Sequence, residues 1–540
     1  MNYKTDVLVI GGGSAGLHAA IEAKKHGVKV ILVYKKGGNA TIMAAGGFAG
    51  NFRLNEEIDE ERVNEVFVED ILKSGRNINN RKIVKKLVEN SSKEIYELQK
   101  LGVKLYEEEN GNIKVFHASG HSYPRTVRCV GGNTRQYYST LRNLALELGV
   151  IIIEDVEIID LVKVNGKVCG AFGIHKNNLI FFSSKSVILA TGGISANYKF
   201  STHRKGIQGN GLIMGLNAGA RLVDMEFIQF MPTVIAYPQN LAGFIVTDTL
   251  RGEGAILLNK HLERFMEKYS PVKKDMETRD IISQSIFQEI YEGRGTERST
   301  VYLDARHIDR EKIKKSFTNY ELLMKAGIDP KENLIEITPG THYTCGGIKI
   351  DDNAYTGVEG LWAAGEVTGG LHGANRLGSV ALTENIVFGK LAGKNAALYC
   401  LEAKKHFVDY RPDYSISYEG QNQEKHKEII ENLRNILSNA AGIVRNEDDL
   451  LKGLKDVEDI LSKLESKEKE KNNYSYELSS TQAKSFALIN YCILKSCLIR
   501  KESRGTHFRK DYVEEKEKLA EPISIERKGE KISHYFDEEL

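Results

Sequence analysis

The stretch TDVLVIGGGSAG at residues 5–16 decides the fold of this chain. Its apolar run ends in a cluster of glycines, a helical pattern continues to residue 25, and a second apolar run occupies residues 28–33. This order of strand, glycine turn, helix and strand is typical of a βαβ unit with parallel strands. The sequence therefore predicts an α/β domain of the Rossmann-like kind that begins with its nucleotide-binding unit.

The glycines of this stretch have separate tasks in such a unit. Gly11 permits the turn, Gly13 lets the backbone approach a pyrophosphate, and Gly16 lets the helix pack closely on the strand. The start of the helix at Ser14 and Ala15 contributes partial positive charge. These five residues form the predicted phosphate loop of a dinucleotide site.

Two later stretches extend the nucleotide signature, whereas the usual feature of an NAD site is missing. Tyr34 and Lys35 stand where an acidic residue would hold a ribose at the end of the second strand. The stretches ILATGG at residues 188–193 and LWAAGE at residues 361–366 instead resemble the two further signatures of FAD proteins. Three signatures in the expected order favour FAD as the cofactor.

The composition argues against several kinds of partner. The 540 residues suffice for about three domains. A net charge of +2 gives no reason to expect nucleic acid or an anionic membrane as a partner. The six cysteines are dispersed without a Cys-x-x-Cys pair, so neither a metal site nor an iron–sulfur cluster is predicted within the chain, and a reducing compartment is expected.

Neither a signal peptide nor a membrane span is predicted. The N-terminus runs directly into the first strand, without a basic region and an apolar core. The most apolar late stretch, residues 487–499, contains Asn490 and Lys495 and is shorter than the ~20 residues that a spanning helix needs. We therefore expect a cytoplasmic protein.

The rest of the chain divides into regions of different pattern. Residues from about 238 to 339 mix helical and irregular patterns, as an inserted α+β capping domain would. After about residue 401 the chain is rich in Lys and Glu, and helical segments near 425–445, 447–466 and 480–502 predict a helical bundle. The predicted domains are a first part of the FAD-binding domain at 1–237, a capping or substrate domain at 238–344, a second part of the FAD-binding domain at 345–405, and a C-terminal helical domain at 406–540.

Further motifs, in order along nearly the whole chain, resemble one known family. They occupy residues 39–47, 120–125, 224–233, 251–254, 278–280, 342–347, 372–378 and 501–509. The chain resembles the flavoprotein subunits of succinate dehydrogenase and fumarate reductase, a family that also contains L-aspartate oxidase. The resemblance implies oxidoreductase activity, electron transport, and further cofactor-binding residues. These are Asn39, Thr41, Gly46, Gly47, Ala190, Thr191, Gly192, Asn210, Glu366, Ser379 and Leu382.

The resemblance also implies a catalytic set for reducing a carbon–carbon double bond beside a carboxylate. His342 and Arg376 would bind one carboxylate, which suits the planar fork of an arginine. Arg279 would donate the proton, with Asp248 and Arg251 as the relay that replaces it. The alternative for these last three residues is a structural ion-pair network. Thr247 would bind the second carboxylate, or is simply a threonine at the end of a strand.

Three positions depart from the family pattern. Met231 stands where the family has a histidine that helps to bind the second carboxylate, and a thioether cannot donate a hydrogen bond. The resemblance and this departure together lead us to expect fumarate or another unsaturated acid, including a monocarboxylate, as the substrate. Ala40 stands where covalently flavinylated members have histidine, so we expect non-covalent FAD. Asn210 replaces an aspartate.

Two other functions stay open at this point. One is amino-acid oxidation in the manner of L-aspartate oxidase, and the other is a flavin subunit that transfers electrons without its own catalysis. An iron–sulfur subunit is the partner that the resemblance implies, although a thiol, flavin or nicotinamide donor is also compatible with the sequence. A membrane would be involved only through a partner.

Overall fold

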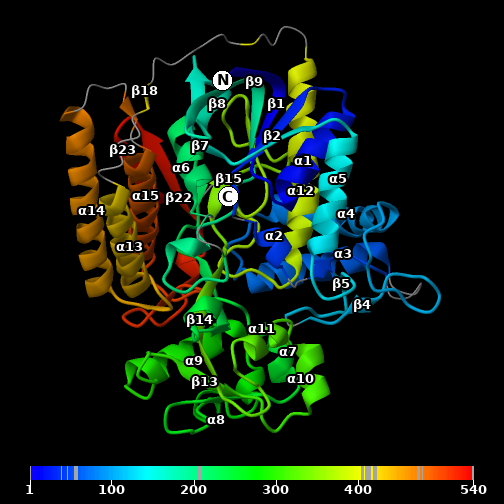
Figure 1. The fold of residues 1–540 in the computed structure, drawn as a ribbon, viewed down its shortest axis with the longest axis vertical. Helices are drawn as coiled ribbons and strands as arrows, with labels where there is room; N and C mark the ends of the chain where they lie inside the picture. The colour runs from blue at the N-terminus through cyan, green and yellow to red at the C-terminus, as the bar shows by residue number, and fades with distance from the viewer. Residues whose placement is uncertain are drawn as a thin grey trace.

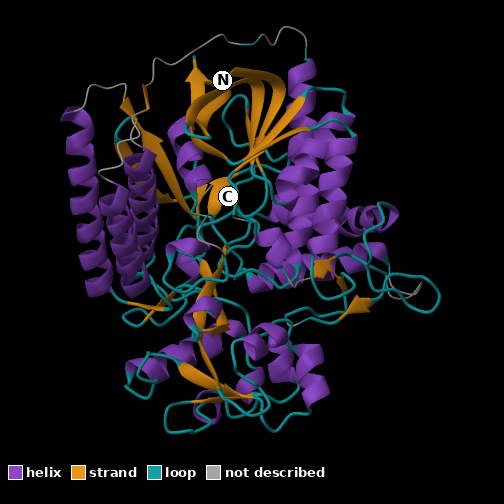
Figure 2. Ribbon diagram, viewed as in Figure 1, coloured by secondary structure: helices purple, strands orange, loops and turns teal. Residues whose placement is uncertain are grey.

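The computed structural model describes residues 2–37, 39–44, 47–53, 59–118, 120–203, 206, 208–402, 407, 415–416, 423–470, 475–476 and 478–537. Figure 1 shows three parts: a sheet covered by helices, a smaller unit below it, and a bundle of helices on the left. The mixed helix and strand content of Figure 2 agrees with the predicted fold class, an α/β domain with a cap and a helical bundle.

The central sheet has parallel strands at its core. β1 (Asn2–Ile10) pairs in parallel with β2 (Val30–Tyr34) on one side and with β9 (Asn178–Leu189) on the other. β6 (Ile151–Glu154) continues the sheet beyond β2, and β16 (Leu361–Ala363) pairs with the end of β9. Val7, Leu8 and Val9 are fully buried, which is why this strand is a continuous apolar run without alternation. The predicted βαβ unit is confirmed.

Two further strands extend the sheet in the antiparallel direction. β8 (Lys167–His175) pairs with the first half of β9, and β7 (Val156–Val164) pairs with β8. β9 thus belongs to both halves of the sheet, because its first half pairs with β8 and its last residues pair with β16.

Helices cover the sheet beside the nucleotide loop. α1 (Ser14–Lys25) packs along α12 (Val380–Leu401), and α5 (Arg135–Glu147) lies next to α1. Gly393 of α12 allows this close approach, since an added Cβ would lie 2.2 Å from the carbonyl oxygen of Ala19. α3 (Glu60–Ser74) and α4 (Arg81–Lys100) form the next layer outward.

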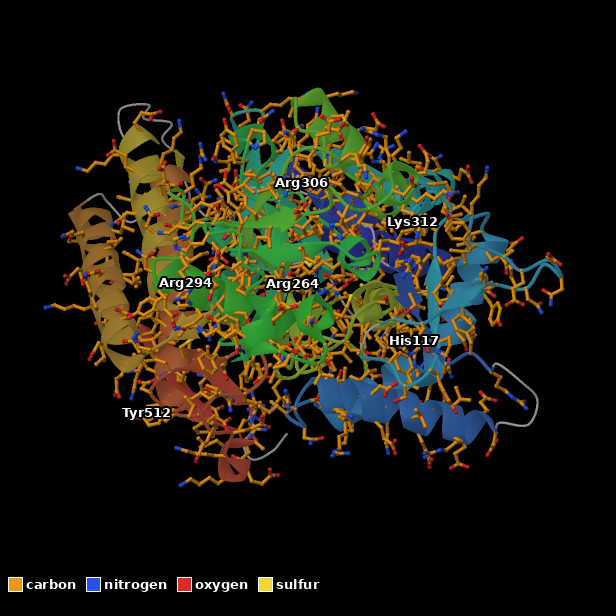
Figure 3. The ribbon with its side chains drawn as sticks, turned by 90° about the horizontal axis from the view of Figure 1, so that it is seen from below. His117, Arg264, Arg294, Arg306, Lys312 and Tyr512 are labelled. Atoms are coloured by element: carbon orange, nitrogen blue, oxygen red, sulfur yellow. The ribbon has the colours of Figure 1, made fainter. Side chains whose placement is uncertain are left out.

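The unit at the bottom of Figure 1 is a cap with its own hydrophobic core. Two long strands, β11 (Ile228–Ile235) and β14 (Ile335–Thr344), connect it to the central sheet and pair with each other. β13 (Val301–Asp304) and β12 (Ile256–Leu258) complete its sheet. Figure 3 views the cap from below, with Arg264, Arg294, Arg306 and Lys312 labelled on it.

Short helices surround the cap's sheet. They are α7 (Asp248–Gly252), α8 (Met266–Tyr269), α9 (Arg279–Tyr291), α10 (Arg310–Ser316) and α11 (Tyr320–Lys325). Two of them begin at predicted catalytic residues, Asp248 and Arg279. The cap's sheet includes β11, which lies before residue 238, the predicted start of the capping domain. The four predicted domain ranges remain a proposed division of the chain.

The C-terminal helices are α13 (Gln423–Ala440), α14 (Glu447–Glu470) and α15 (Leu478–Ile499). The predicted helix at 425–445 was too long. The chain leaves the helix after Ala440, and β19 (Val444–Arg445) pairs with β21 (Phe508–Arg509). None of the helices in the described ranges is both long and apolar enough to cross a membrane.

A β-hairpin near the C-terminus was not predicted. β22 (Ile523–Lys528) and β23 (Lys531–Phe536) join a sheet with β10 (Leu222–Val223), β15 (Gly347–Lys349) and β17 (Thr368–Gly369). The C-terminal region is therefore attached to the central domain by backbone pairing as well as by side chains.

A buried ion-pair network joins the same two regions. Arg500 lies 2.6 Å from Glu226 and 3.0 Å from Glu502, and all three side chains are fully buried. Arg504 binds the same carboxylate, with its Nε 2.7 Å from Oε1 and its Nη2 3.1 Å from Oε2. The network fixes the end of α15 against the residues that lead into β11.

Candidate active site

The turn after β1 places the backbone of the phosphate loop where a nucleotide can approach it. An added Cβ at Gly11 would lie 2.0 Å from the carbonyl oxygen of Ala190, and one at Gly16 would lie 1.9 Å from the carbonyl oxygen of Gly11. Both contacts are with backbone, so neither can be relieved by a side-chain movement. No side chain caps α1, whose N-cap residue is Gly13, and the start of this helix faces a cavity.

Most of the predicted cofactor residues line this cavity. They are Gly11, Gly13, Ser14, Ala15, Asn39, Thr41, Ala190, Thr191, Gly192, Asn210 and Glu366. Gly16 lies behind the cavity, at the contact between α1 and β1. Gly46 lies outside the described residues.

Three other predicted residues do not line the cavity. Gly47 pairs with Arg128 in a small sheet, and Leu382 is buried on α12. Ser379 precedes α12 with φ at 64°, and its carbonyl oxygen accepts a hydrogen bond from the backbone N–H of Ala49. All three remain predicted cofactor residues, and their position holds α12 against the segment after residue 46.

The cavity also has wall residues that the sequence did not identify. Asn385 of α12 donates a hydrogen bond to Ser14 Oγ at 2.9 Å. Tyr34 donates to Glu154 at 2.7 Å and closes the cavity near Gly12. Neither residue belongs to a glycine motif, and the sequence showed Tyr34 only as the residue that stands in place of an acidic ribose ligand.

These walls fit FAD. The hydroxyl oxygen of Thr191 is buried and, among the described residues, has no hydrogen-bond partner. A buried hydroxyl without a partner is rare in native proteins, and a polar group bound in the cavity would supply one. The uncapped helix start and the glycine turn suit a pyrophosphate. The residues present therefore fit the cofactor that the motifs predict.

Glu366 connects this cavity to the neighbouring polar cluster. The backbone N–H of Thr344 donates to Glu366 Oε1 at 3.0 Å, and the carboxyl group lines the cavity. Burial raises the pKa of Glu366 to about 8. At neutral pH the group is therefore mostly protonated and can donate a hydrogen bond as well as accept one.

The neighbouring cluster is built around Arg376, which precedes α12. Gln229 of β11 holds it, because Gln229 Oε1 accepts from Arg376 Nε at 3.2 Å and from Nη2 at 3.0 Å. Gln229 also donates to the carbonyl oxygen of Arg376 at 2.9 Å. The guanidinium carbon lies 4.4 Å from the ring centre of Tyr343, and the hydroxyl of Tyr343 donates to Glu384 at 2.7 Å.

His342 lies at the end of β14, next to this arginine. Its Nδ1 is 2.9 Å from Thr202 Oγ1, which fixes the ring and leaves Nε2 for another partner. Burial, followed by the charges of Arg376 and Arg279, holds the pKa of His342 well below its usual range. The ring is therefore neutral, and Thr202 is a supporting residue that the sequence did not reveal.

Arg279, Asp248 and Arg251 form one ion-pair chain. Asp248 Oδ2 accepts from Arg279 Nε at 2.8 Å and lies 2.6 Å from Nη2, while Asp248 Oδ1 lies 2.5 Å from Arg251 Nη2. Burial alone would raise the pKa of Asp248, but the two arginines outweigh it and hold the pKa at about 2. Arg251 is almost fully buried and also donates to the carbonyl oxygen of Asp275 at 2.9 Å.

The two clusters lie within electrostatic reach of each other. The positive charge of Arg279 lowers the pKa of both His342 and Arg376, so the three side chains lie within electrostatic reach. The structure thus brings together five of the predicted residues, from the cap and from the central domain.

Thr247 and Met231 are placed differently. The hydroxyl of Thr247 donates to the carbonyl oxygen of Ser316 in the cap. Met231 is 3% exposed within β11, where it pairs with Gly340. Neither side chain hydrogen-bonds to the arginine and histidine cluster in the described part of the chain.

The described ranges were also compared with the side-chain groupings that bind metal ions. No group of three or more His, Cys, Asp or Glu side chains there could hold an ion. All six cysteines are free and buried. Burial raises the pKa of Cys345, beside the cluster, to about 12, so this thiol stays protonated.

Comparisons with known proteins agree with this geometry. The chain matches the family described as FAD binding domain over residues 6–382, and the one described as fumarate reductase flavoprotein C-term over residues 430–532. It is 33% identical to a fumarate reductase (CoM/CoB) subunit of Methanothermobacter marburgensis, over 98% of each chain. It is 34% identical to L-aspartate oxidase of Clostridium acetobutylicum, over 73% of this chain and 88% of that one.

A solved structure shows the same architecture. The FrdA chain of an E. coli quinol fumarate reductase variant matches with a TM-score of 0.85 and 26% identity, over 99% of this chain and 97% of that chain. The chain is an FAD-dependent oxidoreductase and belongs to the family of succinate dehydrogenase and fumarate reductase flavoprotein subunits.

Proposed function

We propose that this protein reduces the carbon–carbon double bond of an α,β-unsaturated carboxylic acid, with fumarate as the first candidate and the reverse reaction possible in principle. The observation that carries the proposal is the bridge of Asp248 between Arg279 and Arg251, placed within electrostatic reach of Arg376 and His342. A purely structural ion pair would not need to face a second cluster of cationic and donor groups.

Arg376 and His342 hold the substrate carboxylate in this proposal. Gln229 occupies the Nε and Nη2 edge of the guanidinium, and the remaining N–H groups are available to a carboxylate oxygen. The neutral His342 adds a donor through Nε2 when its Nδ1 accepts from Thr202. Both groups stabilise the negative charge that grows on the carboxylate during the reaction.

Arg279 delivers the proton. Its Nε and Nη2 both contact Asp248, which aims the guanidinium and keeps it in one orientation. Asp248 stays ionised, so it can take part in returning a proton to Arg279 through Arg251. FAD, when bound in the adjoining cavity, supplies the hydride chemistry.

The first test is the reoxidation of a reduced viologen dye by FAD-loaded protein. Fumarate is offered together with a panel of unsaturated mono- and dicarboxylates. Turnover with fumarate supports the proposal, and turnover with a monocarboxylate alone assigns the specificity to Met231. If no acid in the panel causes reoxidation of the dye, the proposal is contradicted.

The variant Arg279→Gln tests the role of the proton donor. It keeps side-chain polarity but loses the acid, so we expect the rate to fall by roughly 10²- to 10⁴-fold while FAD stays bound. Arg306→Gln is the matched control, because Arg306 is also a cap arginine paired with an aspartate, Asp304, at 2.8 Å. Arg279→Gln at the wild-type rate would refute the assignment.

The second candidate is L-aspartate oxidation, favoured by the 34% identity to an L-aspartate oxidase. Hydrogen peroxide production with L-aspartate and oxygen distinguishes it from the reductase. We expect none above the rate of free flavin. Peroxide production together with silence in the viologen assay would move the assignment to this activity.

We further propose that FAD is held without a covalent bond and that electrons arrive through an iron–sulfur subunit. Ala40 has no group that could bond to the flavin, and the chain itself has no cluster of cysteines. Acid precipitation should therefore release all flavin into the supernatant. Protein isolated from its source should co-elute with iron and acid-labile sulfide, and their absence would favour a thiol, flavin or nicotinamide donor.

A further inference from the structure

A second histidine lies beside His342 and has no role in the scheme above. The ring centres of His203 and His342 are 6.3 Å apart. His203 Nδ1 is 4.0 Å from Glu366 Oε2, too far for a hydrogen bond, and the side chain is only 8% exposed. His203 therefore lies close both to His342 of the arginine and histidine cluster and to Glu366 of the cofactor cavity.

One ring nitrogen of His203 has no hydrogen-bond partner among the described residues. Its Nδ1 is buried, and no described residue forms a hydrogen bond with it. Native proteins rarely leave a buried polar atom unpaired, and such atoms are often found where a ligand binds. A ligand with an anionic or hydroxyl group within reach of this nitrogen would supply the missing hydrogen bond.

The backbone around His203 is fixed rather than loosely placed. The backbone N–H of Thr202 donates to the carbonyl oxygen of Thr341 at 2.9 Å, and the N–H of Thr341 donates to that of Phe200 at 2.9 Å. The N–H of His203 donates to Ser201 Oγ at 3.0 Å. The segment of residues 200–203 thus runs alongside β14. Its Thr202 orients His342, and its His203 places a second imidazole beside that ring.

The charges around His203 suit the binding of an acid. Burial, followed by the charge of Arg376, lowers the pKa of His203 to about 4. The neutral ring provides an N–H donor, while Arg376 supplies the positive charge. A neutral His203 avoids placing a further positive charge beside Arg376 when the site is empty.

We infer that His203 is a substrate-binding residue, whose imidazole hydrogen-bonds the acid that His342 and Arg376 hold and thereby supplies a donor that Met231 cannot. The inference rests on the proposed reduction of an unsaturated acid. It identifies a specificity residue outside the motifs that define the family resemblance, since residues 200–203 belong to none of them.

The test compares His203→Ala and His203→Asn with the wild type, all loaded with FAD. Turnover is measured with fumarate, and the dissociation constant of malonate, a dicarboxylate that does not react, is measured from the change in flavin absorbance. We expect His203→Ala to raise both KM and the dissociation constant by roughly ten- to a hundredfold, as the loss of one hydrogen bond to a charged group would. We expect a small change in kcat, and a smaller loss of binding in His203→Asn, which retains a donor.

His261→Ala is the control, because His261 is an exposed histidine of the cap. Unchanged malonate binding in His203→Ala would overturn the inference. So would a loss of FAD in place of a loss of acid binding, which would assign His203 to the cofactor, or the absence of malonate binding in the wild type. If the wild type reduces no acid in the panel but His203→Ala still weakens malonate binding, the proposed reaction fails and His203 remains an acid-binding residue.

Discussion

Met231 is the residue at which this chain departs most clearly from the family's way of binding a dicarboxylate. Its thioether is buried in β11 and can neither donate a hydrogen bond nor carry charge. Met231→His should therefore lower the KM for fumarate by about tenfold, the effect of one added hydrogen bond, with little change for a monocarboxylate.

Met231→Leu is the control for packing, since the two side chains have similar volume and both are apolar. The measurement is the ratio of kcat/KM for fumarate to that for a monocarboxylate such as crotonate. An identical ratio in Met231→His and Met231→Leu would show that this position does not face the second carboxylate.

At the scale of elements, the contact between β1 and α1 makes the nucleotide cavity. Gly16→Ala would push a methyl group against the carbonyl oxygen of Gly11, so α1 would have to move away from the strand. We expect the variant to be purified with less than about a tenth of the wild-type flavin, because the helix start is the phosphate site. The ratio of absorbance at about 450 nm and 280 nm measures this.

A glycine without such a contact provides the control. In Gly252→Ala the added methyl meets nothing closer than 3.9 Å, the side chain of Met276, and the flavin content should stay at the wild-type level. Equal flavin in both variants would mean that α1 can shift without losing the cofactor.

Some of these elements were predictable from the sequence and others were not. The βαβ unit was predictable because its pattern is local: an apolar run, a glycine turn and a helix within the first 33 residues. The hairpin of β22 and β23 is also local, because its strands pair with each other across Gly529 and Glu530, but the sequence analysis did not identify it. The pairing of β22 with β10 could not be predicted, because β10 lies far away in the chain and is only two residues long. Pairing between distant short strands leaves no periodic signal in either segment.

The candidate site divides in the same way. The charged residues Arg251, Arg279 and Arg376 lie in recognisable motifs. The structure joins Arg251 and Arg279 through Asp248 and brings Arg279 within electrostatic reach of Arg376. Thr202 and His203 come from an irregular segment without a motif, and only its backbone pairing with β14 places them beside His342.

At the scale of the whole molecule, the junction between the C-terminal region and the central domain should make stability depend on pH. Burial, then the charge of Glu226, raises the pKa of Asp224, and Arg500 only partly opposes this. The folded state therefore holds this proton more tightly than the unfolded state does. The contribution of Asp224 to the free energy of unfolding is therefore greatest at low pH. It falls as the pH rises above about 4, the ordinary pKa of an aspartate in an unfolded chain.

Asp224→Asn removes the titration and should flatten this dependence. We expect its melting temperature to exceed that of the wild type by several degrees at pH 8.5, with a smaller difference at pH 5. Calorimetry at both pH values, with the exposed Asp459→Asn of α14 as control, measures the effect. A constant difference between Asp224→Asn and the wild type across this range would contradict the prediction.

The pairing of β10 with β22 has a consequence for the order of events on the ribosome. Val223 of β10 is paired with Ser524 of β22, and synthesis of the intervening residues takes on the order of 15 to 60 s. During that interval one edge of β10 has no strand beside it, although β1, β2 and most of the cofactor cavity have already been made. A newly made chain can therefore meet its flavin before its last sheet is complete, and stalled or prematurely terminated chains would present an open strand edge to other proteins.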